Sequence, residues 1–142
     1  MKPILLLFLA LLVSPLTAKA HGEDKPGPNG GFIRMPGAFH TEAVPIGSKQ
    51  LKIFLLDIEW KNPTVVNSSV KATHVSSSKK KTDGVCKPKE NYFVCNFDGS
   101  ADLTKPGKLK VEAQRNLQKG IPVSYPLPFK LEVVDDGLGT HH

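Results

Sequence analysis

After its first twenty residues, this sequence has no apolar run near the roughly 20 residues that a bilayer-spanning helix needs. It has only two cysteines, too few for a disulfide-dense scaffold, and no Gly-X-Y or heptad repeat that would indicate a fibre. A hydrophobic content of 39% argues against global disorder. The 142 residues therefore predict one small globular domain without stable membrane insertion.

The sequence also lacks the common signatures of enzymes. It contains no Gly-x-Ser-x-Gly elbow, His-Glu-x-x-His pair, phosphate-binding glycine loop or EF-hand loop. Nucleic-acid binding would need basic residues interleaved with aromatic residues on one face, whereas Lys79–Lys81 stands in a Ser-rich stretch without aromatics. We therefore expect neither catalysis nor nucleic-acid binding, and interpret residues 76–84 as a solvated loop.

The first twenty residues are typical of a secretory signal peptide. Lys2 precedes an apolar run from Ile4 to Val13, and Ala18-Lys19-Ala20 forms a small-x-small cleavage site. Cleavage after Ala20 would remove two lysines, leaving 17 basic and 13 acidic residues and a net charge of +4. Residues 1–20 are thus predicted to be a signal peptide, and the protein to be periplasmic or secreted.

The two cysteines, Cys86 and Cys95, are separated by eight residues. In an exported protein an isolated pair is expected to form a disulfide. A redox-active pair normally has Cys-x-x-Cys spacing, so catalysis by these thiols is not expected. Metal binding by the two thiolates is the minor alternative.

Beyond the signal, short apolar alternations separated by Gly and Pro predict strands. Residues 21–31 carry two Pro and four Gly and predict an extended, irregular arm that ends in a turn. Residues 32–134 form the predicted β-domain and residues 135–142 a flexible tail. The expected strands cover residues 32–35, 38–44, 50–60, 69–75, 92–97, 109–113 and 121–134.

Two of these strands have patterns that place them in a sheet. Residues 50–60 are apolar on both phases, which predicts a central strand buried on both faces. Residues 121–134 carry prolines on one phase, which predicts a broken edge strand. Seven or eight short strands predict an all-β fold, an immunoglobulin-like sandwich first and a cupredoxin-like one second.

His21 would become the first residue of the processed chain. Its α-amine and imidazole Nδ1 can chelate one cation, and both groups lose their protons cheaply near neutral pH. A second imidazole would complete a histidine brace, a set of three nitrogens that suits Cu(II). The alternative is a frayed terminus that happens to begin with histidine.

Three further residues, all within 22 positions of His21, strengthen the metal hypothesis. Strand alternation puts His40 and Glu42 on one face, where Glu42 can share a metal or orient the imidazole. Met35 lies just upstream, and a thioether favours Cu(I). The alternatives are Met35 as core filler and His40 as a surface residue paired with Glu42. His74, Trp60 and Tyr92 are further candidates for lining the site, and His141 and His142 are either a metal-binding tail or a cloning remnant.

The segments HGEDKPGPNGG, FHTE and LKIFLLD resemble a group of small periplasmic bacterial proteins. These proteins carry a His-Gly arm, a Gly-Pro-His-Gly-Gly turn and a His-x-Glu strand, and similar segments occur in extensions of heavy-metal efflux adaptors. The resemblance covers about residues 21–63 and implies a periplasmic copper or heavy-metal context for His21, His40 and Glu42. In size, compartment and terminus the chain is also similar, more weakly, to copper carriers of the CopC type.

The leading hypothesis is an exported copper carrier or buffer that binds Cu(II), and also Cu(I), through His21, His40, Glu42 and Met35. Its partner would be a metal-efflux or copper-acquisition protein. A second hypothesis is a metal-free interaction module that docks through an edge strand or through Lys79–Lys81. A small copper oxidase is the third.

Overall fold

The computed structural model describes residues 23–131, and within this range the chain is all-β. Among these residues no helix has the length and apolar character needed to cross a membrane. The predicted signal peptide, His21 and the predicted tail 135–142 lie outside the described residues. The strands are β1 (Phe32–Arg34), β2 (His40–Pro45), β3 (Gln50–Leu56), β4 (Ser69–Ser76), β5 (Lys81–Asp83), β6 (Val85–Lys89), β7 (Tyr92–Asn96), β8 (Gly107–Arg115), β9 (Gln118–Lys119) and β10 (Val123–Leu127).

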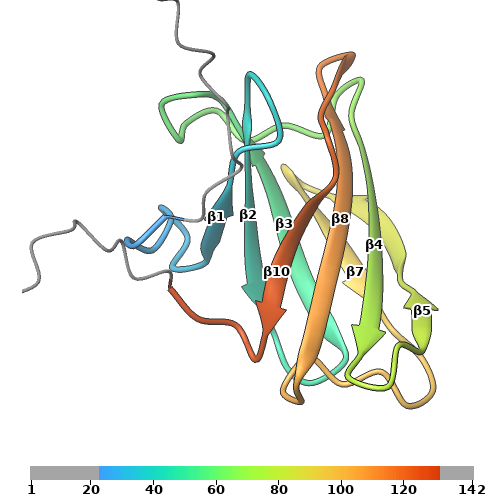
Figure 1. The fold of residues 1–142 in the computed structure, drawn as a ribbon. Helices are drawn as coiled ribbons and strands as arrows, with labels where there is room; N and C mark the ends of the chain where they lie inside the picture. Colours follow the sequence, from blue (N-terminus) through green and yellow to red (C-terminus); the bar gives the residue numbers. More distant parts are fainter. Residues whose placement is uncertain (1–22, 132–142) are drawn as a thin grey trace, which may run out of the picture.

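The strands form two antiparallel sheets that face each other (Figure 1). The first sheet has the order β1-β2-β3-β7-β6, and the second has the order β10-β8-β4-β5, with β9 paired to β8. The prediction of an all-β sandwich is confirmed, although the described residues form ten strands rather than seven or eight. The finer choice between an immunoglobulin-like and a cupredoxin-like arrangement stays a prediction.

The hydrophobic core fills the space between the sheets. Its members come from the inward phases of both sheets, and include Leu51, Ile53, Leu55, Ala72, Phe93, Leu109, Val111, Val123 and Tyr125. The opposite phase of β3 packs into a second cluster outside the first sheet, where Phe54 and Leu56 meet Ile33 and Tyr92. Strand β3 is therefore central and buried on both faces, as its pattern predicts.

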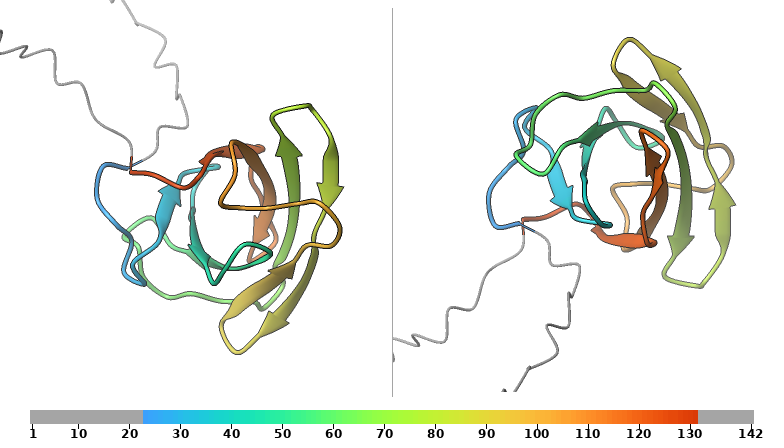
Figure 2. Two further views of the ribbon diagram at one scale, coloured as in Figure 1. Left: turned by 90° about the horizontal axis from the view of Figure 1, so that it is seen from below. Right: turned by 90° about the horizontal axis from the view of Figure 1, so that it is seen from above.

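The two sheets are joined along both sides, so that they curve around one interior (Figure 2). On one side the chain passes from β5 of the second sheet to β6 of the first through Gly84, whose N–H donates to the Ala72 carbonyl at 2.8 Å. On the other side the buried Arg34 of β1 donates from Nε to the Ser124 carbonyl of β10 at 2.9 Å. Its guanidinium also lies 4.8 Å from the ring centre of Tyr125.

Several predicted boundaries are wrong. Lys81–Asp83 is not part of a solvated loop, because it pairs with β4 as strand β5. No sequence pattern indicates strands β6 and β9, because their exposed residues show no apolar alternation. The strand predicted over residues 50–60 ends at Leu56, where Asp57 begins a turn, and the last strand covers only Val123–Leu127.

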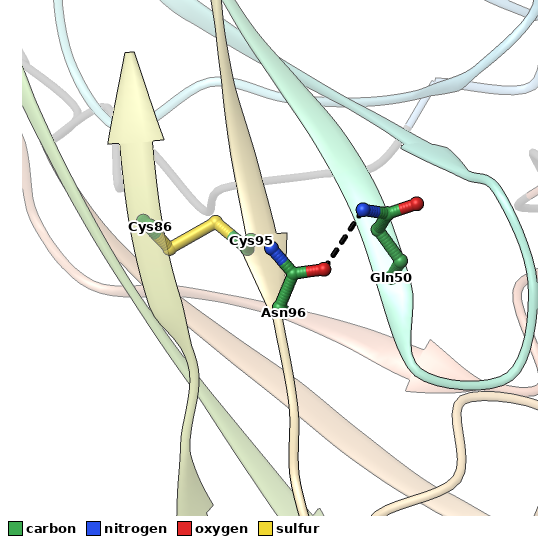
Figure 3. Close-up of a disulfide and its surroundings, with 4 residues drawn as sticks. All are labelled: Gln50, Cys86, Cys95 and Asn96. Carbon is green, nitrogen blue, oxygen red and sulfur yellow. Dashed lines mark hydrogen bonds between the residues drawn. A yellow bond between two sulfur atoms is a disulfide. The ribbon is translucent and has the colours of Figure 1, made fainter. Parts of the chain in front are cut away.

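The predicted disulfide is confirmed. Cys86 of β6 and Cys95 of β7 lie directly opposite each other in the hairpin and are bonded (Figure 3). Cys95 is fully buried in the core between the sheets, so the bond links the edge strand β6 to the core. Such a bond is the state expected in an oxidising compartment.

Candidate metal centre

His40 is the first residue of β2 and is almost fully buried, with 4% of its surface exposed. It lies opposite Leu56, and Glu42 lies opposite Phe54, so both side chains are on the outer face of the first sheet. Thr41 faces the interior, where its hydroxyl is 2.7 Å from that of Tyr125. The alternation predicted for this segment is therefore correct, and the alternative of His40 as a surface residue is wrong.

The His40 ring has one engaged and one unengaged nitrogen. Nδ1 lies 3.1 Å from the backbone oxygen of Asp57. Because a carbonyl oxygen can only accept, the neutral ring carries its proton on Nδ1 and its lone pair on Nε2. Nε2 has no hydrogen-bond partner among residues 23–131. The only side-chain nitrogen or oxygen in this range that is both unpartnered and fully enclosed is Nδ1 of His74, so Nε2 of His40 keeps contact with solvent.

A rigid turn presents the Asp57 carbonyl. The Asp57 carboxylate accepts hydrogen bonds from the N–H groups of Glu59 and Lys61, both at 2.9 Å, and from the Asn62 amide at 2.8 Å. The bonds from Lys61 and Asn62 hold the pKa of this carboxyl below its ordinary value. Trp60 and Asn62 have φ values of 64° and 54°, a backbone region that non-glycine residues seldom adopt without such support.

Trp60 brings an aromatic ring to the site from the same turn. The Trp60 and His40 rings meet edge to face, with their centres 6.0 Å apart. Trp60 also packs against the outer cluster that contains Leu56. The turn thus supplies both the hydrogen-bond acceptor and one wall of the His40 environment.

Glu42 has a different environment, because the arm before β1 folds over it. The carboxylate is fully buried and accepts hydrogen bonds from the backbone N–H of Asn29 and of Gly31 at 2.9 Å and from the Asn29 amide at 2.8 Å. Gly27 approaches so closely that a Cβ atom there would overlap the carboxylate. Glu42 therefore anchors the arm to the sheet, and Asp57 rather than Glu42 orients Nδ1 of His40.

The sequence signal for this anchor is a glycine-rich turn, residues 27–31, near a strand that carries an acid on its apolar face. The sequence pattern predicts an irregular arm that ends in a turn and a metal-binding role for Glu42, but nothing in it indicates that the Glu42 carboxylate holds this turn. The metal-binding roles predicted for Glu42 stay predictions.

Met35 follows β1 directly. The β1–β2 register pairs Arg34 with Thr41, and Met35 and His40 are the next residues along the two chains. Met35 is two residues from Ile33, which packs in the outer cluster. Its side chain is 40% exposed, so the alternative of Met35 as core filler is wrong.

The remaining candidates do not join this site. His74 belongs to the inward phase of β4, with Nε2 3.2 Å from the Asp102 carbonyl and its ring edge-on to Phe97. Tyr92 lies on the outer face of β7, packed against Phe54. In the described part of the chain, no group of three His, Cys, Asp or Glu side chains is arranged to hold a metal on its own. Metal binding at His40 would therefore need ligands from outside that range, such as His21, or the Met35 thioether.

Comparison with known proteins finds no matching family model, no matching curated protein and no matching solved structure. The resemblance to periplasmic metal-associated proteins stays a prediction carried by residues 21–63.

Proposed function

We propose that this protein is an exported copper carrier or buffer, with a site formed by Nε2 of His40 and the amine and imidazole of His21. The Met35 thioether is the additional ligand for Cu(I). The observation that carries the proposal is the hydrogen bond from Nδ1 of His40 to the Asp57 carbonyl. Histidines that ligate metals commonly donate their other ring N–H to a carbonyl, which fixes the tautomer and aims the free nitrogen.

The anchoring of the arm supports a role for His21. Gly27 is held against Glu42, which stands two residues from His40 on the same strand face, a separation of about 7 Å. The six residues 21–26 can span up to about 20 Å when extended. A processed N-terminus therefore has ample length to bring its amine and imidazole to His40, and Glu42 contributes by fixing the base of the arm.

The chemistry of these groups fits carriage of copper. Two imidazoles and an amine suit the tetragonal preference of Cu(II), and the thioether suits Cu(I). A site shared between a terminal arm and a fixed strand can exchange ligands one at a time, which favours transfer to a partner. The signal-like N-terminus and the disulfide support an exported protein.

The test is a Cu(II) titration of protein that its own signal has exported and that intact mass shows to begin at His21. Trp60 is the only tryptophan in the chain, and its ring lies 6.0 Å from that of His40, so bound Cu(II) should quench its fluorescence. We expect one tight site and an axial EPR spectrum with nitrogen couplings. His40→Gln, which keeps a donor for the Asp57 carbonyl, should abolish the tight site, and so should one extra residue before His21.

His74→Gln is the matched control, because it removes an equally buried imidazole on the other sheet and should leave the affinity unchanged. Copper binding and Trp60 quenching that persist in both His40→Gln and the extended form would overturn the proposal.

Two of the four edge strands oppose the competing hypothesis of docking through an edge strand. Strand β6, at the edge of the first sheet, carries Lys87, Pro88 and Lys89. Strand β10, at the edge of the second, carries Pro126. Lysine and proline on edge strands oppose the addition of a further strand.

A further inference from the structure

The outer face of the first sheet has a second half, away from His40, where strands β3, β7 and β6 line a shallow hollow. The hollow has a volume of about 400 Å³, and its polar lining consists of Gln50, Lys52, Lys87, Lys89, Tyr92 and Asn96. His40 lies opposite Leu56, four residues along β3 from Lys52, or about 13 Å. We call this feature the lysine hollow; it is separate from the candidate metal centre.

Three lysines converge on this hollow from two strands. In the register, Lys52 lies opposite Val94, and Val94 lies opposite Lys87, so the Lys52 and Lys87 backbones are about 10 Å apart across β7. Lys89 is two residues from Lys87 and faces the same side. No acidic residue lines the hollow, and no ion pair within residues 23–131 involves these lysines. Three lysines that line one hollow, with no acidic residue in its lining, favour an anionic ligand.

The other polar groups indicate what kind of anion fits. Gln50 Nε2 donates to Asn96 Oδ1 at 2.8 Å, which orients both amides at the edge of the hollow (Figure 3). Asn96 Nδ2 and Gln50 Oε1 keep the capacity to donate to and accept from hydroxyl groups. The cations are all lysines, whose ammonium groups act as point charges rather than as the flat fork that arginine presents to phosphate.

The aromatic residue of the hollow is not a stacking platform. Tyr92 is only 8% exposed, and Nζ of Lys52 lies 4.8 Å from its ring centre. Phe54 packs against the same ring, with the two ring centres 5.0 Å apart. Single-stranded nucleic acids are bound by stacking bases on open aromatic faces, which this arrangement does not offer.

We propose that the lysine hollow binds an acidic oligosaccharide. Carboxylate or sulfate groups along the sugar chain pair with Lys52, Lys87 and Lys89, and sugar hydroxyls bond to the amides of Gln50 and Asn96. Lys52 on β3 and the two lysines on β6 reach successive anionic groups of one extended chain, while the hollow accommodates a sugar ring between them.

The experiment is calorimetric titration of the full chain with a sulfated and carboxylated heparin-type hexasaccharide. Maltohexaose, which is neutral, and a single-stranded DNA octamer serve as comparison ligands. We expect binding of the acidic hexasaccharide that weakens as salt is raised, no binding of maltohexaose and much weaker binding of DNA. Asn96→Ala, which changes no charge, should lower the affinity several-fold.

A matched pair of triple variants separates a site from general charge attraction. Lys52→Gln/Lys87→Gln/Lys89→Gln should lower the affinity at least about tenfold. Lys79→Gln/Lys80→Gln/Lys81→Gln removes the same charge from the β4–β5 hairpin and should change the affinity less than about twofold. Equal losses in the two variants, DNA binding as tight as that of the hexasaccharide, or no binding of the hexasaccharide at low salt would each overturn the proposal.

Discussion

Nδ1 of His40 and the backbone oxygen of Asp57 lie 3.1 Å apart, and this contact joins the first residue of β2 to the turn that follows β3. It sets the tautomer of a buried imidazole without using a second side chain. The carboxylate of Asp57 accepts the hydrogen bonds that hold the turn. The backbone carbonyl of the same residue orients the His40 ring. The candidate ligand atom of His40, Nε2, is therefore aimed by a feature seventeen residues away in the sequence.

Removing the charge of Glu42 should detach the arm from the sheet. In Glu42→Gln one oxygen becomes an NH₂ group that faces N–H donors of Asn29 or Gly31, so buried donors lose their acceptor. We expect the free energy of unfolding to fall by about 2 kcal/mol, and by about 1 kcal/mol in Asn29→Ala, which removes one side-chain bond. Urea denaturation measures both changes.

The matched control for this prediction is Glu112→Gln. Its carboxylate is 44% exposed and lies 3.5 Å from Nζ of Lys110, and an exposed pair of this kind should contribute less than about 1 kcal/mol. If Glu42→Gln proves no more destabilising than Glu112→Gln, the anchoring role of Glu42 is wrong.

Acid should loosen the turn at residues 57–62. Because hydrogen bonds lower the pKa of Asp57 in the folded protein, its carboxylate stabilises the turn fully above the unfolded pKa of about 3.9. This stabilisation is lost as pH falls through the lower, folded pKa. We expect the fluorescence emission of Trp60 to change in that acid range. The change should be absent in Asp57→Asn and present in Glu59→Gln. If the acid transition persists in Asp57→Asn, it arises from a group other than Asp57, and the prediction is wrong.

Alkali should destabilise the interior through Tyr125. Burial raises the pKa of the Tyr125 phenol above its ordinary value of about 10, with the hydrogen bond to Thr41 opposing the shift. The buried phenol thus contributes its full stability below about pH 10, and this is lost as pH rises and the unfolded chain ionises. Tyr125→Phe should be less stable at pH 7 by about 1 kcal/mol, because it loses the bonds to Thr41, yet less sensitive to pH above 10.

Urea denaturation at a series of pH values tests the Tyr125 prediction. Tyr92→Phe changes the only other tyrosine and should keep the alkaline loss of stability. The prediction is contradicted if Tyr125→Phe loses stability between about pH 10 and 12 as steeply as the parent protein does.

The passage between the sheets should tolerate no side chain at Gly84. A Cβ atom there would lie 2.9 Å from ring atoms of Phe97, which is buried in the core. Gly84→Ala should therefore lower the free energy of unfolding by about 1–3 kcal/mol. Gly47→Ala places its methyl group where no atom lies within 4 Å and should leave stability unchanged or slightly raised. Thermal unfolding of the two variants measures the difference.

Much of the fold could be predicted because its signals are local. An apolar run on both phases identifies β3 as a doubly buried strand, whereas period-two alternation identifies β10 and its buried phase, and the prolines of β10 indicate an edge position. The alternation that puts His40 and Glu42 on one face needs only neighbouring residues. By contrast β5 and β6 carry lysines and exposed residues, so nothing in their own segments indicates pairing with β4 and β7.

By itself the sequence determined an all-β domain, a central doubly buried strand, a proline-bearing edge strand and a cysteine pair fit to be bonded. The tertiary structure alone decided which partners the polar groups meet. Glu42 accepts hydrogen bonds from Asn29 and Gly31, and Nδ1 of His40 donates to the Asp57 carbonyl. Lys52 and Lys87 line one hollow. The physical reason is that alternation reports which way a side chain points, whereas its partners depend on which strands pair and in which register.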